Sequence, residues 1–166
     1  MARVAICGVA RTPIGKFRGS LSNLSAVELG IRAVKELLNR CDIDPSSGII
    51  DEVLFGQVLQ AGAGQAPARQ ASLFANIPKA VGCTTINKMC GSGMKTVMLA
   101  HDSLVARSNN IIIAGGFESM SNSPYILPKA RSGQRIGHGK MIDHMFIDGL
   151  EDAYEKGTLM GVFAER

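Results

Sequence analysis

The chain has 166 residues, a length that supports one folded domain with a buried core. Hydrophobic residues make up 46% and charged residues 19%, and the 19 glycines follow no period, which excludes disordered, low-complexity and collagen-like chains. Much of the net charge of +4 comes from residues 129–140, a stretch without Phe, Tyr or Trp, which argues against nucleic-acid binding.

The first part of the chain contains apolar runs that alternate with helix-forming segments. Residues 4–9 form a short apolar run that predicts a strand, and residues 25–40 predict a helix. That helix opens on a capping box, in which Ser25 and Glu28 each bond the backbone N–H of the other residue. A second strand is expected within residues 49–59.

The alternation continues with a helix expected at residues 65–75 and a strand at residues 81–86. The next helix has an apolar stripe, on which His101 is interpreted as a packing residue. The stripe consists of Met94, Val97, Met98, His101, Leu104 and Val105. Three consecutive isoleucines within residues 110–114 predict a buried strand. This order indicates an α/β fold, with a mostly parallel, mixed sheet covered by helices.

The cysteines, at positions 7, 41, 83 and 90, form no C-x-x-C pattern and have no histidines at zinc-binding spacing. We therefore expect neither a metal nor a bound cofactor, and a chain of this size does not need disulfides. No signal-peptide pattern precedes the first apolar run, and no apolar stretch approaches membrane-spanning length. A cytoplasmic protein without a membrane partner is expected.

Cys90 lies where the strand at residues 81–86 leads into the following helix. Backbone N–H groups without helical partners, together with the helix dipole, stabilise a thiolate at such a junction. Gly91 and Gly93 remove side-chain bulk, so a substrate carbonyl can approach the sulfur and an oxyanion can bind backbone N–H groups such as that of Cys90. A tightly packed structural cysteine is the alternative that this local pattern leaves open.

Residues 86–97, INKMCGSGMKTV, resemble the acyl-enzyme motif of the thiolase family, the acetyl-CoA acetyltransferases and 3-ketoacyl-CoA thiolases. Three further stretches resemble this family in the expected order: residues 11–19 (RTPIGKFRG), 114–121 (AGGFESMS) and 160–165 (MGVFAE). The resemblance spans essentially the whole chain, which is therefore interpreted as the amino-terminal part of such an enzyme. It implies an α/β domain at residues 1–119 and the start of an incomplete loop domain at residues 120–166.

The resemblance implies that Cys90 attacks an acyl-CoA thioester, releases coenzyme A and holds the acyl group. A second acyl-CoA then attacks that group in a Claisen condensation, and the reverse reaction cleaves a 3-ketoacyl-CoA. In the family, a histidine of a Gly-His-Pro segment and a second cysteine of a Cys-x-Gly-Gly-Gly segment assist. Neither segment occurs in these 166 residues, so the chain alone is expected to be inactive. Cys83 is interpreted as a buried strand cysteine, with a second catalytic or resolving role as the alternative.

Residues 132–140 are similar to the basic loop through which many thiolases form tetramers. The resemblance therefore implies a homo-oligomer, a dimer or tetramer, with Arg131, Arg135, His138 and Lys140 as oligomerisation residues. Attraction of the coenzyme A phosphates and a solvated surface loop are the alternatives. His138 and His144 are both expected to face solvent or an interface.

Leu159 and Met160 lie where the family binds the pantetheine arm and the acyl chain, so they are predicted substrate-binding residues. Biosynthetic acetoacetyl-CoA thiolases often carry histidine directly before that methionine, and Leu159 therefore favours a broader range of acyl groups. Two other functions stay open. One is another cysteine-dependent condensing enzyme of the superfamily, and the other is a non-catalytic half-domain that binds acyl-CoA or pairs with another chain.

Overall fold

The computed structural model describes residues 3–166 and has a three-stranded parallel sheet at its centre. Strand β1 (Glu52–Gly56) lies between β2 (Gly82–Ile86) and β3 (Ile112–Gly116). The register sets Gly56 opposite both Ile86 and Gly116, so the three strands end at one edge. Residues that follow the strands therefore meet at that edge.

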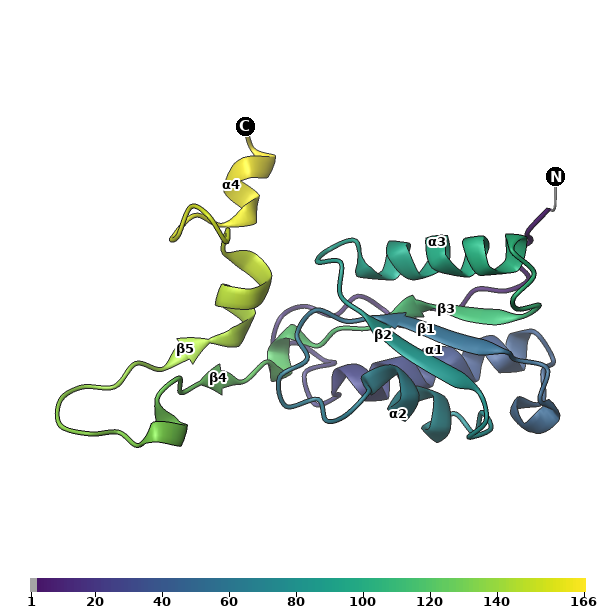
Figure 1. The fold of residues 1–166 in the computed structure, drawn as a ribbon, viewed down its shortest axis with the longest axis horizontal. Coiled ribbons are helices and arrows are strands. Elements are labelled where there is room, and N and C mark those ends of the chain that lie inside the picture. Colours follow the sequence, from purple (N-terminus) through teal and green to yellow (C-terminus); the bar gives the residue numbers. More distant parts are fainter. Residues whose placement is uncertain (1–2) are drawn as a thin grey trace.

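Helices cover both faces of this sheet, as Figure 1 shows. α1 (Ala26–Arg40) and α2 (Pro67–Phe74) lie on one face, and α3 (Ser92–Val105) lies on the other. The predicted α/β fold, a parallel sheet flanked by helices, is confirmed. The three strands and three helices named here each overlap a segment that the sequence predicts.

Helix α1 begins with the predicted capping box. The Ser25 hydroxyl accepts the Glu28 N–H at 3.2 Å, and the Glu28 carboxylate accepts the Ser25 N–H at 2.7 Å. Two backbone donors of the first turn are thereby satisfied, which fixes where the helix starts. The Ser25 N–H and the Ser25 hydroxyl both donate to the Glu28 carboxylate, and these two bonds hold the pKa of Glu28 below its usual value.

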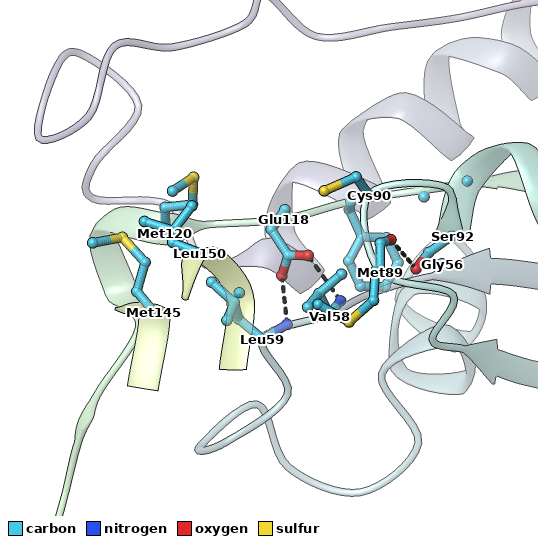
Figure 2. Close-up of a pocket in the computed structure, with 14 residues that line it drawn as sticks. Gly56, Val58, Leu59, Met89, Cys90, Ser92, Glu118, Met120, Met145 and Leu150 are labelled. Carbon is cyan, nitrogen blue, oxygen red and sulfur yellow. Dashed lines mark hydrogen bonds between the residues drawn. The ribbon is translucent and has the colours of Figure 1, made fainter. Parts of the chain in front are cut away.

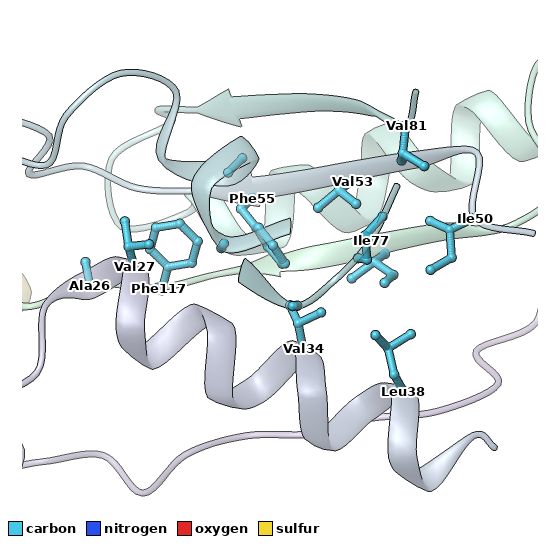
Figure 3. Close-up of a cluster of buried hydrophobic side chains, with 14 residues drawn as sticks. Ala26, Val27, Val34, Leu38, Ile50, Val53, Phe55, Ile77, Val81 and Phe117 are labelled. Carbon is cyan, nitrogen blue, oxygen red and sulfur yellow. The ribbon is translucent and has the colours of Figure 1, made fainter. Parts of the chain in front are cut away.

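The main hydrophobic core lies between the sheet and helix α1 (Figure 3). Val34 and Leu38 of α1 face Val53 and other buried residues of this core. Phe117, directly after β3, packs its ring 5.3 Å from that of Phe55, at an interplanar angle of 59°. This core holds α1 against the strands whose ends carry the site described below.

The prediction of a strand at residues 4–9 is wrong. The segment is extended, but it pairs with no strand in the part of the chain that the structure describes. Ile6 and Val9 expose 78% and 70% of their surface, and the Val9 carbonyl accepts a bond from the Arg40 guanidinium at 3.2 Å. An apolar, β-prone run becomes a strand only where a sheet edge faces it, and here it runs past the end of α1 instead.

The apolar stripe of α3 lies on the outer side of the helix, so the expectation that it packs into the core is wrong. Met94 and Met98 expose 70% and 54% of their surface. The buried face carries small or hydroxyl-bearing residues at intervals of four, Ser92, Thr96 and Ala100. Small side chains let α3 approach the sheet closely, and the Thr96 hydroxyl bonds the Gly115 carbonyl of β3 at 2.9 Å.

After β3 the chain leaves the layered part of the molecule (Figure 1). β4 (Tyr125–Ile126) pairs antiparallel with β5 (Ile142–Asp143), and the basic loop connects them. A π-helical turn (Phe146–Leu150) and a short helix, α4 (Met160–Ala164), follow. No helix within residues 3–166 combines the length and apolar character needed to cross a membrane.

Candidate active site

Cys90 lies in the tight turn that joins the end of β2 to the start of α3. It is exposed and a free thiol, and it lines a pocket at the edge where the three strands end. Figure 2 shows it beside Met89 and Ser92 of the same turn. The predicted position of this cysteine at a strand-to-helix junction is confirmed.

The turn is held together by Ser92, whose side chain is 5% exposed. Its hydroxyl donates to the Met89 carbonyl at 2.6 Å and accepts the Lys88 N–H at 2.8 Å. Met89 has a left-handed backbone (φ 50°), a conformation that costs energy for a residue with a side chain. Ser92 therefore stabilises the strained residue directly before Cys90.

The backbone N–H groups of this turn differ in their availability. Those of Gly91 and Ser92 already bond the carbonyls of Lys88 and Met89, at 3.2 and 2.9 Å. They are therefore less suited to an oxyanion than the N–H of Cys90 itself. The oxyanion role of Cys90 stays a prediction.

Two glycines that the sequence reasoning did not single out set the position of the turn. A Cβ on Gly56, at the end of β1, would lie 2.5 Å from the Ser92 carbonyl carbon and 2.6 Å from the Gly93 nitrogen. A Cβ on Gly116, at the end of β3, would lie 2.9 Å from the Gly56 carbonyl oxygen. Gly56 needs glycine because the start of α3 lies directly on the end of β1, and Gly116 needs it because the β1 carbonyl lies so close. A glycine that ends a buried strand was the signal available in the sequence.

The pocket beside Cys90 has a volume of about 480 Å³ and mostly apolar walls. Its walls come from the ends of β1 and β3, the Cys90 turn and the π-helical turn. The side chains that define it include Leu59, Met89, Met120, Met145 and Leu150 (Figure 2). An apolar pocket next to a thiol suits an acyl group. Among residues 3–166, no three His, Cys, Asp or Glu side chains gather in a way that could hold a metal ion.

Glu118 is the carboxylate that lines this pocket. Its two oxygens accept the N–H groups of Val58 and Leu59, at 2.8 and 3.1 Å. Burial raises the pKa of Glu118, while those two bonds and the nearby His144 act in the opposite direction. The sequence reasoning assigned Glu118 no role. An acidic residue directly after a buried strand, at the same sheet edge as Cys90, was the signal that could have found it.

The other residues predicted from the resemblance lie apart from Cys90. Leu159 and Met160 are at the start of α4, each 38% exposed, and neither lines the Cys90 pocket. Their substrate-binding role stays a prediction. Residues 131–140 are exposed along their length, and they include the predicted oligomerisation residues Arg131, Arg135, His138 and Lys140.

Two histidines differ from their expected environments. His101 was expected to be a packing residue, but it is exposed and lies 3.2 Å from the Asp102 carboxylate, because the apolar stripe of α3 faces outward. His144 was expected to face solvent or an interface, but it is 6% exposed because the chain after β5 folds back onto the residues that follow β1. Cys83 lies in β2, partly buried against the core, in keeping with a packing role.

The parallel sheet, the strand-to-helix cysteine and the apolar pocket define an α/β protein with a cysteine site at its sheet edge. The model of the family described as "Thiolase, N-terminal domain" matches residues 4–166. The chain therefore belongs to the thiolase family.

Relatives carry names from the same family. The chain is 56% identical to "Acetyl-CoA acetyltransferase 1" of Arabidopsis thaliana, over 98% of this chain and 38% of that protein. It is 50% identical to "Acetyl-CoA acetyltransferase IB" of Candida tropicalis, over 98% of this chain and 40% of that protein. It is 47% identical to an "Acetyl-CoA acetyltransferase" of Cupriavidus necator, over 99% and 41%. The chain thus spans about two fifths of the length of these relatives.

Proposed function

We propose that the protein is an acyltransferase of the thiolase type, which forms or cleaves 3-ketoacyl-CoA through an acyl group carried on Cys90. The observation that supports this most directly is the exposed Cys90 thiol at the start of α3, with an apolar pocket beside it. The start of a helix stabilises a thiolate, and the pocket accepts the apolar part of an acyl group.

In the proposed first step, the Cys90 thiolate attacks the thioester carbonyl of an acyl-CoA. A tetrahedral oxyanion forms, and the backbone N–H of Cys90 stabilises it. The oxyanion collapses, the bond to the coenzyme A sulfur breaks, and coenzyme A leaves as a thiolate that takes up a proton. The products are an acyl-cysteine and free coenzyme A.

In the proposed second step, another acyl-CoA loses a proton from the carbon beside its carbonyl. That carbon attacks the acyl-cysteine, the carbon–sulfur bond breaks, and 3-ketoacyl-CoA and the Cys90 thiolate result. Thiolysis is the same sequence in reverse, with coenzyme A as a substrate. A histidine and a second cysteine, which the family supplies from segments outside this sequence, are the proposed proton carriers.

The remaining assignments are also proposals. Leu159 and Met160 would contact the pantetheine arm or the acyl chain. Arg131 and Arg135 would belong to the contact between copies in a homo-dimer or homo-tetramer. A cytoplasmic location fits the four cysteines, all of which are free thiols.

Incubation with acetyl-CoA tests the proposal. The complete protein is mixed with acetyl-CoA and quenched in acid, and its peptides are analysed by mass spectrometry. An acetyl adduct on Cys90, absent from the Cys90→Ala variant, is the expected result. An adduct on Cys83 alone would overturn the assignment of the nucleophile. Binding of acetyl-CoA without any adduct would favour the non-catalytic half-domain instead.

A further inference from the structure

The residues that follow β1 form one wall of the Cys90 pocket. They are residues 57–61, called here the 57–61 segment, and Val58 and Leu59 line the pocket directly. Gln57 still bonds the sheet, because its N–H donates to the Ile86 carbonyl at 3.0 Å. Beyond Gln57 the segment has left the strand ladder, so its position depends on contacts from other parts of the chain.

Glu118 holds this segment from the sheet side. It lies two residues after β3, and each of its oxygens accepts one N–H, from Val58 at 2.8 Å and from Leu59 at 3.1 Å. A carboxylate bound to two successive amides fixes their orientation as well as their distance. The residues that follow β1 and β3 are thereby joined beside the pocket, and the dashed lines from Glu118 in Figure 2 mark these two bonds.

His144, which follows β5, binds the far end of the same segment. Its Nε2 accepts the Ala61 N–H at 3.4 Å, and its Nδ1 lies 2.7 Å from the Asp148 carboxylate. An amide N–H can only donate, so Nε2 is the acceptor toward Ala61, and Nδ1 faces the Asp148 carboxylate. The orientation of the ring is therefore fixed by a residue of the π-helical turn.

The two contacts connect three parts of the molecule. Glu118 belongs to the sheet edge, whereas His144 lies after β5, in the part of the chain that leaves the layers. The π-helical turn that carries Asp148 also contributes Gly149 and Leu150 to the pocket. The 57–61 segment is therefore bonded to residues from both sides of the pocket.

We propose that Glu118 and His144 are positioning residues, which together fix the 57–61 segment as the wall against which the substrate acyl group lies. This inference rests on the proposed acyl transfer to Cys90. Within the described residues neither side chain bonds Cys90. Their loss should therefore change how acyl-CoA is held and leave the reactivity of the sulfur itself intact.

The test compares Glu118→Gln and His144→Leu in the complete protein. Glu118→Gln keeps one acceptor oxygen. Its NH₂ group would face the second backbone N–H and cannot accept a bond from it. A leucine at 144 keeps apolar bulk and removes the acceptor for Ala61. Glu155→Gln and His101→Leu, at exposed positions, are the matched controls.

Two rates are measured for each variant. The first is the initial release of coenzyme A as a function of acetyl-CoA concentration, and the second is the alkylation of Cys90 by iodoacetamide, which needs no acyl pocket. We expect the half-saturating acetyl-CoA concentration to rise about tenfold in each variant, as for loss of a bond to a buried or charged group. Alkylation should stay within about twofold of the wild type, because neither side chain bonds the sulfur. The controls should match the wild type in both rates.

The double variant supplies an independent readout. Because both residues act on one segment, its half-saturating concentration should rise by less than the product of the two single effects. Unchanged half-saturation in both single variants would overturn the inference, and so would a parallel fall in alkylation. Loss of folded structure in both variants, seen by circular dichroism, would also overturn it, since the contacts would then be requirements of the fold. A wild type that alkylates but forms no acetyl adduct would instead refute the proposed function.

Discussion

Replacement of Gly56 by alanine should separate the start of α3 from the sheet. The added Cβ would lie 2.5 Å from the Ser92 carbonyl carbon and 2.6 Å from the Gly93 nitrogen. Both are backbone atoms, which cannot rotate aside. An ordinary contact begins near 3.4 Å, so α3 and β1 must move apart by about 0.9 Å, the difference between 3.4 and 2.5 Å.

Such overpacking should lower the free energy of unfolding by about 1–3 kcal/mol. The Cys90 turn is attached to the displaced end of α3, so the nucleophile moves as well. A displacement near 1 Å at a reacting centre lowers rates by about a hundredfold. We therefore expect Gly56→Ala to lose acylation far more than it loses stability.

Urea unfolding followed by circular dichroism measures the first effect, and the time course of acetyl-Cys90 formation in the complete protein measures the second. Gly82→Ala, at the start of β2, is the control, because a Cβ there would have no close neighbour within 4 Å. It should change stability by less than about 1 kcal/mol and leave acylation unchanged. Equal losses of unfolding free energy in the two variants would refute the steric reasoning. Acylation of Gly56→Ala at the wild-type rate would refute it as well.

Three further predictions concern single side chains. Ser92→Ala should destabilise the fold by about 1–2 kcal/mol in urea unfolding, because the partly buried Lys88 N–H loses its acceptor. Thr96→Val, on the inner face of α3, should cost about 1–2 kcal/mol, whereas Met98→Gln on the exposed face should cost less than about 0.5 kcal/mol. Asp51 accepts two backbone N–H groups, of Asn110 and Ile111, which lower its pKa. Its stabilisation is therefore present above the unfolded pKa and is lost as the pH falls through the folded one, so Asp51→Asn should lower the thermal midpoint at neutral pH and converge with the wild type in acid. A constant difference at every pH would contradict this.

Local signals explain why much of the fold could be predicted from the sequence. The capping box of Ser25 and Glu28 and the isoleucines before Ala114 specify their elements without help from distant residues. The position of Cys90 follows in the same way, since a β-prone run, a short turn and a helical period are all close in the chain. Recognition of the family added the chemistry expected of that cysteine.

Long-range contacts explain what could not be predicted. The run at residues 4–9 has strand propensity, but pairing depends on which edge faces it. The buried side of α3 is chosen by close approach to glycines, so apolar character pointed to the wrong face. Glu118 and His144 owe their roles to residues 59 to 83 positions away, a spacing that no periodicity reports.

The exposed methionines of α3 make that helix a natural reporter of its own surroundings. Thioethers open to water are converted to sulfoxides by peroxide, while those under a protein surface react slowly. Met94 and Met98 are exposed to solvent within residues 3–166, whereas Met145 is partly buried within the pocket wall. The protein purified from cells can be oxidised briefly and its peptides mapped by mass spectrometry. Slow sulfoxide formation at Met94 and Met98 would then show that another polypeptide covers α3.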